Sequence, residues 1–252
     1  MANFRTHIST SSVLGVGYTS AGIAYFHDEA GALPLASCVL AGGMCSIAGM
    51  LPDIDSETGI PLRETMAFGA AAVPMMMVDR FQQIGMSHQS IVLAGVGIYL
   101  FIRFVVAWMI KKYTVHRGMF HSIPAAIIAT ELGFLLACPP NLMLRYYMAG
   151  GVFLGFMSHL LLDEWYSVDT RRGRIRLKKS FGTAVKFWGN STYANISTYV
   201  KVGILTMMVF SDPIVMERLG EQRTQMQIVD KAQERTQNYH RVALEGIQSL
   251  FK

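Results

Sequence analysis

Residues 147–163 read YMAGGVFLGFMSHLLLD, an apolar stretch that ends in a histidine and an aspartate. The spacing of four places His159 and Asp163 one turn apart on a single helix face, where both side chains can reach one ion. Ionisable groups are costly to bury against apolar spans, so their presence there indicates a function. The stretch predicts an apolar helix whose last turns carry a polar site.

The rest of the chain is similarly apolar. Of its 252 residues 52% are hydrophobic and 15% charged, whereas roughly 25% are charged in an ordinary soluble domain. This composition excludes disordered, collagenous and disulfide-scaffold classes, and the three cysteines form no CxxC pair. Other apolar stretches lie at 11–26, 33–51, 65–78, 89–110, 123–138 and 199–215. We therefore expect an all-α, multi-pass helical membrane bundle of about six or seven apolar helices, although several stretches are shorter than the ~20 residues of a perpendicular span.

The C-terminal part differs in charge and pattern. Residues 164–198 are polar and basic, and residues 216–252 have the apolar periodicity of one long amphipathic helix. We expect a membrane-embedded domain over residues 1–198, with a basic loop at 164–198, followed by the last apolar helix and the tail at 199–252. The tail has three possible targets: the bundle, the membrane surface or a protein partner. The basic segment is expected to contact anionic lipid headgroups, and no specific nucleic-acid binding is expected.

The candidate metal ligands share one topological property. If each of the first six apolar stretches crosses the membrane once, five of their ends emerge on one face. These are the start of the first stretch, the end of the second, the end of the fourth, the start of the fifth and the end of the sixth. The histidines and aspartates at these positions are His7, Asp53, Asp55, His116, His121, His159 and Asp163. Imidazole and carboxylate ligands suit Zn, Mn or Fe, and the surplus over four ligands suggests two divalent ions, which we expect to be Zn or Mn.

Basic residues predict which side of the membrane this face occupies. The ligand face carries Arg5, Arg63, Lys111, Lys112, Arg117 and the segment 171–186. The opposite loops show only Arg80 and Arg145. By the positive-inside rule, the predicted site faces the cytoplasm.

Four motifs in order carry a family resemblance. They are the early His7, Pro-Asp-Ile-Asp-Ser at 52–56, His-Arg-Gly-x-x-His-Ser at 116–122 and Ser-His-x-x-x-Asp at 158–163. Over about residues 1–190 the chain resembles the YdjM-like family, described as LexA-binding, inner-membrane-associated metal-dependent hydrolases. That family looks distantly similar to zinc-dependent phospholipase C. The resemblance implies a bacterial inner membrane location, and metal ligation by His7, Asp53, His116 or His121, His159 and Asp163.

The expected activity is hydrolysis of a phosphoester by metal-activated water, and a lipid-linked phosphoester fits the membrane location. A bound divalent ion lowers the pKa of water from about 15.7 toward ~7 and supplies hydroxide at neutral pH. Asp55 or His121, whichever is not a ligand, could accept the water's proton or orient a liganding imidazole. Arg117 could grip a phosphate oxygen.

Two other functions remain open at this stage. The first is a non-catalytic membrane scaffold, in which a structural metal site holds the helix ends together and the tail recruits a protein partner. The second is a haem protein, since histidines near helix ends can ligate haem across a bundle.

Overall fold

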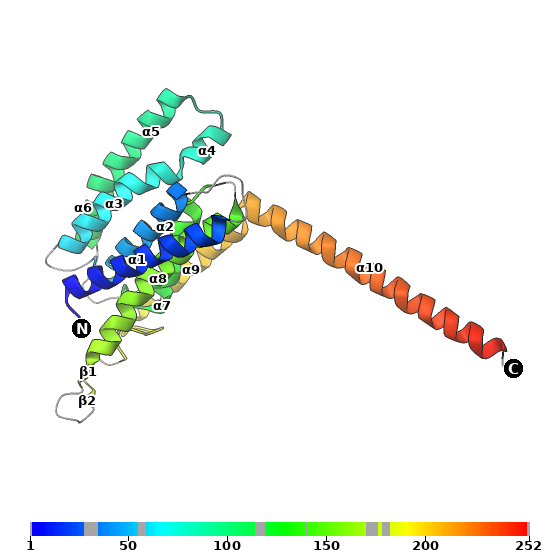
Figure 1. The fold of residues 1–252 in the computed structure, drawn as a ribbon. Coiled ribbons are helices and arrows are strands. Elements are labelled where there is room, and N and C mark those ends of the chain that lie inside the picture. The colour runs from blue at the N-terminus through cyan, green and yellow to red at the C-terminus, as the bar shows by residue number, and fades with distance from the viewer. Residues whose placement is uncertain are drawn as a thin grey trace. The chain divides into compact units, whose positions relative to one another are not determined.

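The computed structural model describes residues 2–27, 35–54, 59–113, 119–139, 141–169, 176–177 and 182–250. Over these residues the all-α prediction is confirmed (Figure 1). The β structure within them is one antiparallel pair of two-residue strands, β1 (Val168–Asp169) and β2 (Arg176–Leu177). The chain divides into two compact units, Met1–Met207 and Met208–Lys252.

The helices of the first unit follow one another along the chain, with the strands β1 and β2 between the last two. Their bounds are α1 (Phe4–His27), α2 (Leu35–Ala48), the 3₁₀ turn η1 (Leu51–Asp53), α3 (Ile60–Met76), α4 (Val78–Gln83), α5 (His88–Leu100), the π-helical turn η2 (Phe101–Val106), α6 (Ala107–Tyr113), α7 (Ile123–Leu136), α8 (Leu142–Ser167) and α9 (Thr192–Phe210). The last residues of α9 and the whole of the last helix, α10 (Pro213–Leu250), belong to the second unit.

Helices α1, α2 and α8 form the centre of the first unit, and α7 packs on α8. Small residues allow α2 and α8 to approach closely. A Cβ at Gly155 would collide with the backbone carbonyl of Cys45, and a Cβ at Gly151 would lie 2.7 Å from the carbonyl oxygen of Ala41. Such small residues four apart are typical of helix packing in membranes. They bring the last turns of α8 against the end of α2, where the predicted ligands lie.

Helix ends are set by capping residues and prolines close to the predicted site. The side chain of Asn3 accepts a hydrogen bond from the backbone of Thr6 at the start of α1. Pro52 follows the end of α2 and lies in η1. The Ser122 hydroxyl accepts a hydrogen bond from the backbone of Ala125 and so caps α7.

Four helices begin several residues before the corresponding apolar stretches: α1, α3, α8 and α9. Helix α8 begins at Leu142 because Asn141 caps it, and α9 begins at Thr192. The placement of Arg145 in a loop was therefore wrong. Arg145 lies in the first turn of α8 and is 1% exposed, with its guanidinium donating to the carbonyl of Phe134 and stacking over the Phe134 ring. Hydropathy detects only the apolar part of a helix and misses polar first turns.

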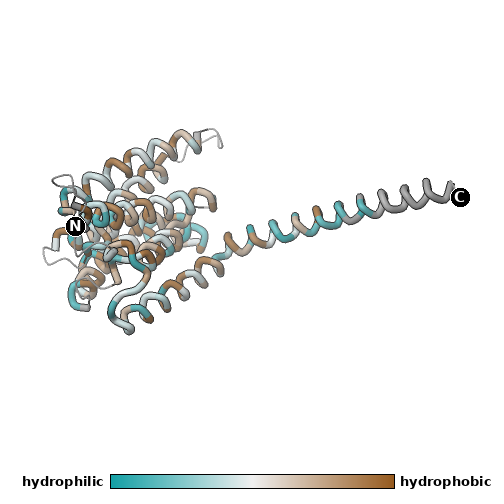
Figure 2. The backbone as a smooth tube through the Cα atoms, turned by 90° about the horizontal axis from the view of Figure 1, so that it is seen from below, coloured by the Kyte–Doolittle hydropathy of each residue, from teal (hydrophilic) through white to brown (hydrophobic). Residues whose placement is uncertain are grey.

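Few of the helices satisfy the length and hydropathy of a membrane span. Among the described residues, the continuous helix His88–Lys112 does, and α9 with the start of α10 does if the two count as one broken span. Helices α2 and α7 are apolar but have 14 residues each. Figure 2 shows apolar colouring along most helices of the first unit and both polar and apolar residues along the coloured part of α10. The helical fold is thus established, whereas six or seven crossings remain a proposal.

Candidate metal centre

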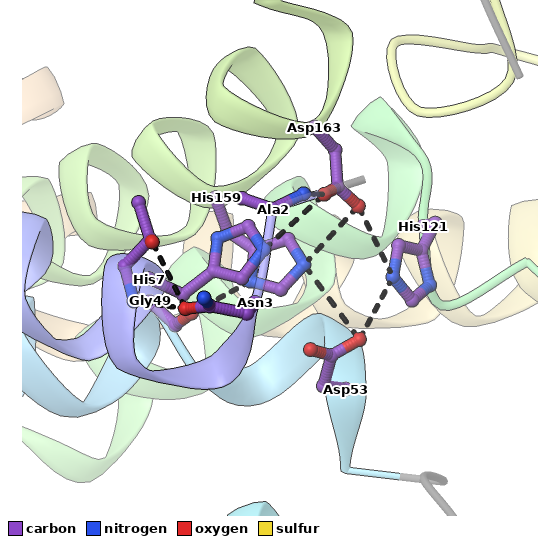
Figure 3. Close-up of polar contacts among 9 residues, drawn as sticks. Ala2, Asn3, His7, Gly49, Asp53, His121, His159 and Asp163 are labelled. Atoms are coloured by element: carbon purple, nitrogen blue, oxygen red, sulfur yellow. Dashed lines mark hydrogen bonds and ion pairs between the residues drawn. The ribbon is translucent and has the colours of Figure 1, made fainter. Parts of the chain in front are cut away.

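Five of the seven predicted ligands come together at one end of the first unit (Figure 3). His7 lies in the first turn of α1, Asp53 in η1 after α2, and His121 immediately before the cap of α7. His159 and Asp163 lie on the last turns of α8. Chain reversals between antiparallel helices therefore gather groups that are up to 156 positions apart in the sequence.

His159 occupies the centre of this cluster and is 1% exposed. Its Nδ1 donates a hydrogen bond to the carbonyl oxygen of Gly49, at 2.8 Å. In the neutral ring the other nitrogen, Nε2, therefore carries the lone pair. Nε2 is buried and has no hydrogen-bond partner among the described residues.

Two carboxylates face the Nε2 atom of His159. It lies 3.8 Å from Oδ1 of Asp53 and 3.7 Å from Oδ2 of Asp163. These distances are too long for hydrogen bonds. A buried lone pair opposite two carboxylate oxygens is electrostatically unfavourable unless a cation lies between them, so the residues fit a metal ion.

His121 completes a four-membered set of donor atoms. Its Nε2 lies 3.2 Å from Oδ1 of Asp53 and 4.0 Å from Oδ2 of Asp163. Ligands at 2.0–2.1 Å from a tetrahedral ion are separated from one another by about 3.3–3.4 Å. Of the four nitrogen–oxygen distances in this set, the 3.2 Å distance is close to that separation and the other three, at 3.7–4.0 Å, are slightly wider.

Asp163 is held in place by its other oxygen. Its Oδ1 accepts hydrogen bonds from the backbone N–H of Ala2, at 2.9 Å, and from His7, whose Nε2 lies 3.2 Å away. The ring of His7 also stacks on the ring of His159, with centroids 3.6 Å apart. These contacts leave Oδ2 of Asp163 directed at the cluster.

The sequence profile of the YdjM inner membrane protein family matches residues 1–206. The chain belongs to this family. The matched segment contains all five clustered side chains and ends at the boundary between the two units. No curated protein and no solved structure matches the chain.

The cluster of this YdjM family member opens to solvent at Asp53. The Asp53 side chain is 27% exposed, while those of His7, His121, His159 and Asp163 are at most 6% exposed. Burial alone would raise the pKa of the Asp53 carboxyl, but the hydrogen bond from His121 and the charges of neighbouring imidazoles lower it, and the net shift is downward. Asp53 is therefore an anion at neutral pH at the accessible edge of the cluster.

The remaining predicted site residues cannot be placed. Asp55, His116 and Arg117 lie outside the described residues. Two groups were missed by sequence reasoning, the carbonyl of Gly49 and the N–H of Ala2, because backbone groups carry no residue-type signal. His88 is an exposed histidine at the start of α5 and does not belong to the cluster.

Proposed function

We propose that this member of the YdjM family is a membrane-bound metal-dependent hydrolase that cleaves a phosphoester through metal-activated water. The observation that carries the proposal is the unpartnered Nε2 of His159, buried between the carboxylates of Asp53 and Asp163. Imidazole and carboxylate donors without thiolate suit Zn or Mn.

In this proposal four side chains hold one ion: Asp53, His121, His159 and Asp163. The Gly49 carbonyl fixes the ring orientation of His159. His7 and Ala2 fix the carboxylate of Asp163. Such supporting hydrogen bonds orient ligands and raise their basicity.

The two candidate triads, His7–Asp53–His159 and His121–His159–Asp163, both include His159. A neutral imidazole offers one lone pair, so His159 serves one ion. A second ion therefore requires donors besides His159. Asp55 and His116 remain the proposed candidates, and Arg117 remains the proposed phosphate contact.

The bound ion supplies hydroxide at neutral pH by lowering the pKa of water, and it stabilises charge on a phosphoryl oxygen. The chain's own contribution is positioning. Since Asp53 is the exposed member, substrate approaches from its side. With His121 assigned to the ion, the proposed proton acceptor is Asp55, in the case that Asp55 does not ligate a second ion.

Membrane topology belongs to the same proposal. We place the site on the cytoplasmic face of a multi-pass bundle, on the basis of Arg5, Arg63, Lys111 and Lys112 near the ligand ends of their helices. Membrane lipid is the expected surrounding, and α10 is the proposed contact for a protein partner.

The test combines metal analysis with turnover. Full-length protein is purified without chelators, its metal content is measured, and hydrolysis of generic phosphodiesters is compared with that of His159→Ala. The matched control is His88→Ala, which removes an exposed histidine. The proposal predicts metal and turnover in the wild type and His88→Ala, and neither in His159→Ala.

Each competing function gives a different result. Bound metal without His159-dependent turnover would overturn the hydrolase and support the scaffold. A Soret absorbance band in the purified protein would instead support a haem protein.

A further inference from the structure

An apolar cavity of about 550 Å³ lies within the first unit. Its walls come from η1, α6, α7, α8, α9 and the residues just before α7. Ile54, Phe120, Ile128 and Phe156 are among the apolar side chains that line it. The volume falls in the range of about 300–1,000 Å³ that is typical of ligand sites.

The cavity and the metal centre share two wall segments. Leu51 in η1 and Ile54 directly after it line the cavity, while Asp53 between them belongs to the metal centre. Before α7, Phe120 lines the cavity and the next residue, His121, belongs to the metal centre. Since consecutive Cα atoms are about 3.8 Å apart, the walls of the cavity and of the metal centre adjoin at these two segments.

The chemistry of the lining selects the class of occupant. A peptide would bring backbone N–H and C=O groups that need hydrogen-bond partners, and the walls from η1, α7 and α8 present apolar side chains. A hydrocarbon chain has no such requirement and gains from burial in proportion to its area. The side chain of Lys201 on α9 also lines the cavity and is exposed. Its positive charge favours an anionic ligand.

We infer that the substrate is an anionic amphiphile, with its hydrocarbon chain in this cavity and its phosphoester at the metal centre. The inference rests on the proposed hydrolase, which it extends by naming the substrate class. It predicts that affinity depends on chain length and on the free volume of the cavity.

Binding of alkyl phosphates from ethyl to decyl tests this prediction. The full-length, metal-loaded protein is kept in a fluorinated surfactant, which mixes poorly with hydrocarbon. Affinity should rise by up to about fourfold per buried methylene. An affinity independent of chain length would overturn the inference.

Filling the cavity gives the matched comparison. Ala194 lines the cavity on α9, whereas a Cβ at Gly203 on the same helix would meet no described atom within 4 Å. Ala194→Phe should weaken decyl phosphate binding at least tenfold and leave ethyl phosphate binding unchanged, and Gly203→Phe should leave both unchanged. Ser197→Leu is a smaller change in the lining and should also weaken the binding of decyl phosphate. Equal decyl phosphate affinities in all three variants would contradict the placement of the hydrocarbon chain in the cavity.

Hydrolysis of a phosphodiester that has no hydrocarbon chain distinguishes failure of this inference from failure of the proposed function. This hydrolysis should be lost in His159→Ala and retained in Gly203→Phe. Chain-length dependence without any turnover would overturn the hydrolase while leaving the hydrocarbon site intact. His159-dependent turnover without chain-length dependence would overturn the hydrocarbon site alone.

Discussion

The Nδ1 atom of His159 donates a hydrogen bond to the carbonyl oxygen of Gly49, at 2.8 Å. This bond joins α8 to the end of α2 and decides which nitrogen faces the carboxylates. The metal centre is therefore built into the packing of the two helices, since Gly155 lets α8 approach α2 at the turn before His159.

Replacement of His7 by Phe should weaken metal binding without abolishing it. Phe keeps a ring to stack on His159 but removes the Nε2 contact that holds Asp163. Loss of such a supporting contact typically costs 10–100-fold in metal affinity. Competition with a fluorescent zinc chelator measures the effect, and His88→Phe is the control. Complete loss of metal, as in His159→Ala, would instead make His7 a direct ligand.

Removal of the α7 cap should affect both stability and metal binding. Ser122→Ala removes the acceptor for the Ala125 N–H next to His121 and should cost about 1 kcal/mol of stability. Ser87 caps α5 in the same way, but away from the cluster. Ser87→Ala should therefore lower the thermal midpoint without changing metal affinity. If both variants bind metal like the wild type, the cap does not position His121.

Close packing of α8 on α2 predicts sensitivity to a single methyl group. Gly155→Ala should destabilise the protein by about 1–3 kcal/mol, because the added Cβ collides with the Cys45 carbonyl. Gly97→Ala on α5 is the control, since its Cβ would meet no described atom within 4 Å. It should be neutral or slightly stabilising, as alanine is the better helix former. Thermal unfolding in detergent compares the two, and equal midpoints would contradict the packing.

A reciprocal tyrosine pair joins α1 to α8. The Tyr18 hydroxyl donates to the Tyr147 carbonyl, the Tyr147 hydroxyl donates to the Tyr18 carbonyl, and the rings stack with centroids 4.3 Å apart. Tyr18→Phe keeps the stacking and removes one hydrogen bond, which should cost about 1 kcal/mol. The exposed Tyr25 offers the control Tyr25→Phe, for which no change is expected. An unchanged thermal midpoint in Tyr18→Phe would show that the pair contributes little.

The sequence predicted the helical class and the meeting of His7, Asp53, His121, His159 and Asp163, because direction reversals follow from the apolar stretches. Their role as ligands stays a prediction. The division of roles between His7 and His121 could not be predicted, since it depends on which oxygen of Asp163 each ring faces.

Two features lay beyond sequence reasoning for different physical reasons. Arg145 was placed in a loop because a charged residue interrupts a hydropathy pattern, whereas in the fold its guanidinium stacks on Phe134 inside the first unit. The cavity was not foreseen because its walls come from segments distant in sequence, and only packing shows what those segments leave empty.

X-ray absorption at the K-edge of the bound metal tests the central claim most directly, because it reports the donor atoms without requiring a substrate. We predict a shell of nitrogen and oxygen donors at about 2.0–2.1 Å for Zn, with the outer-shell scattering of two imidazoles, and no bound metal in His159→Ala. A sulfur shell at about 2.3 Å, or a protein that takes up no divalent metal, would contradict the account.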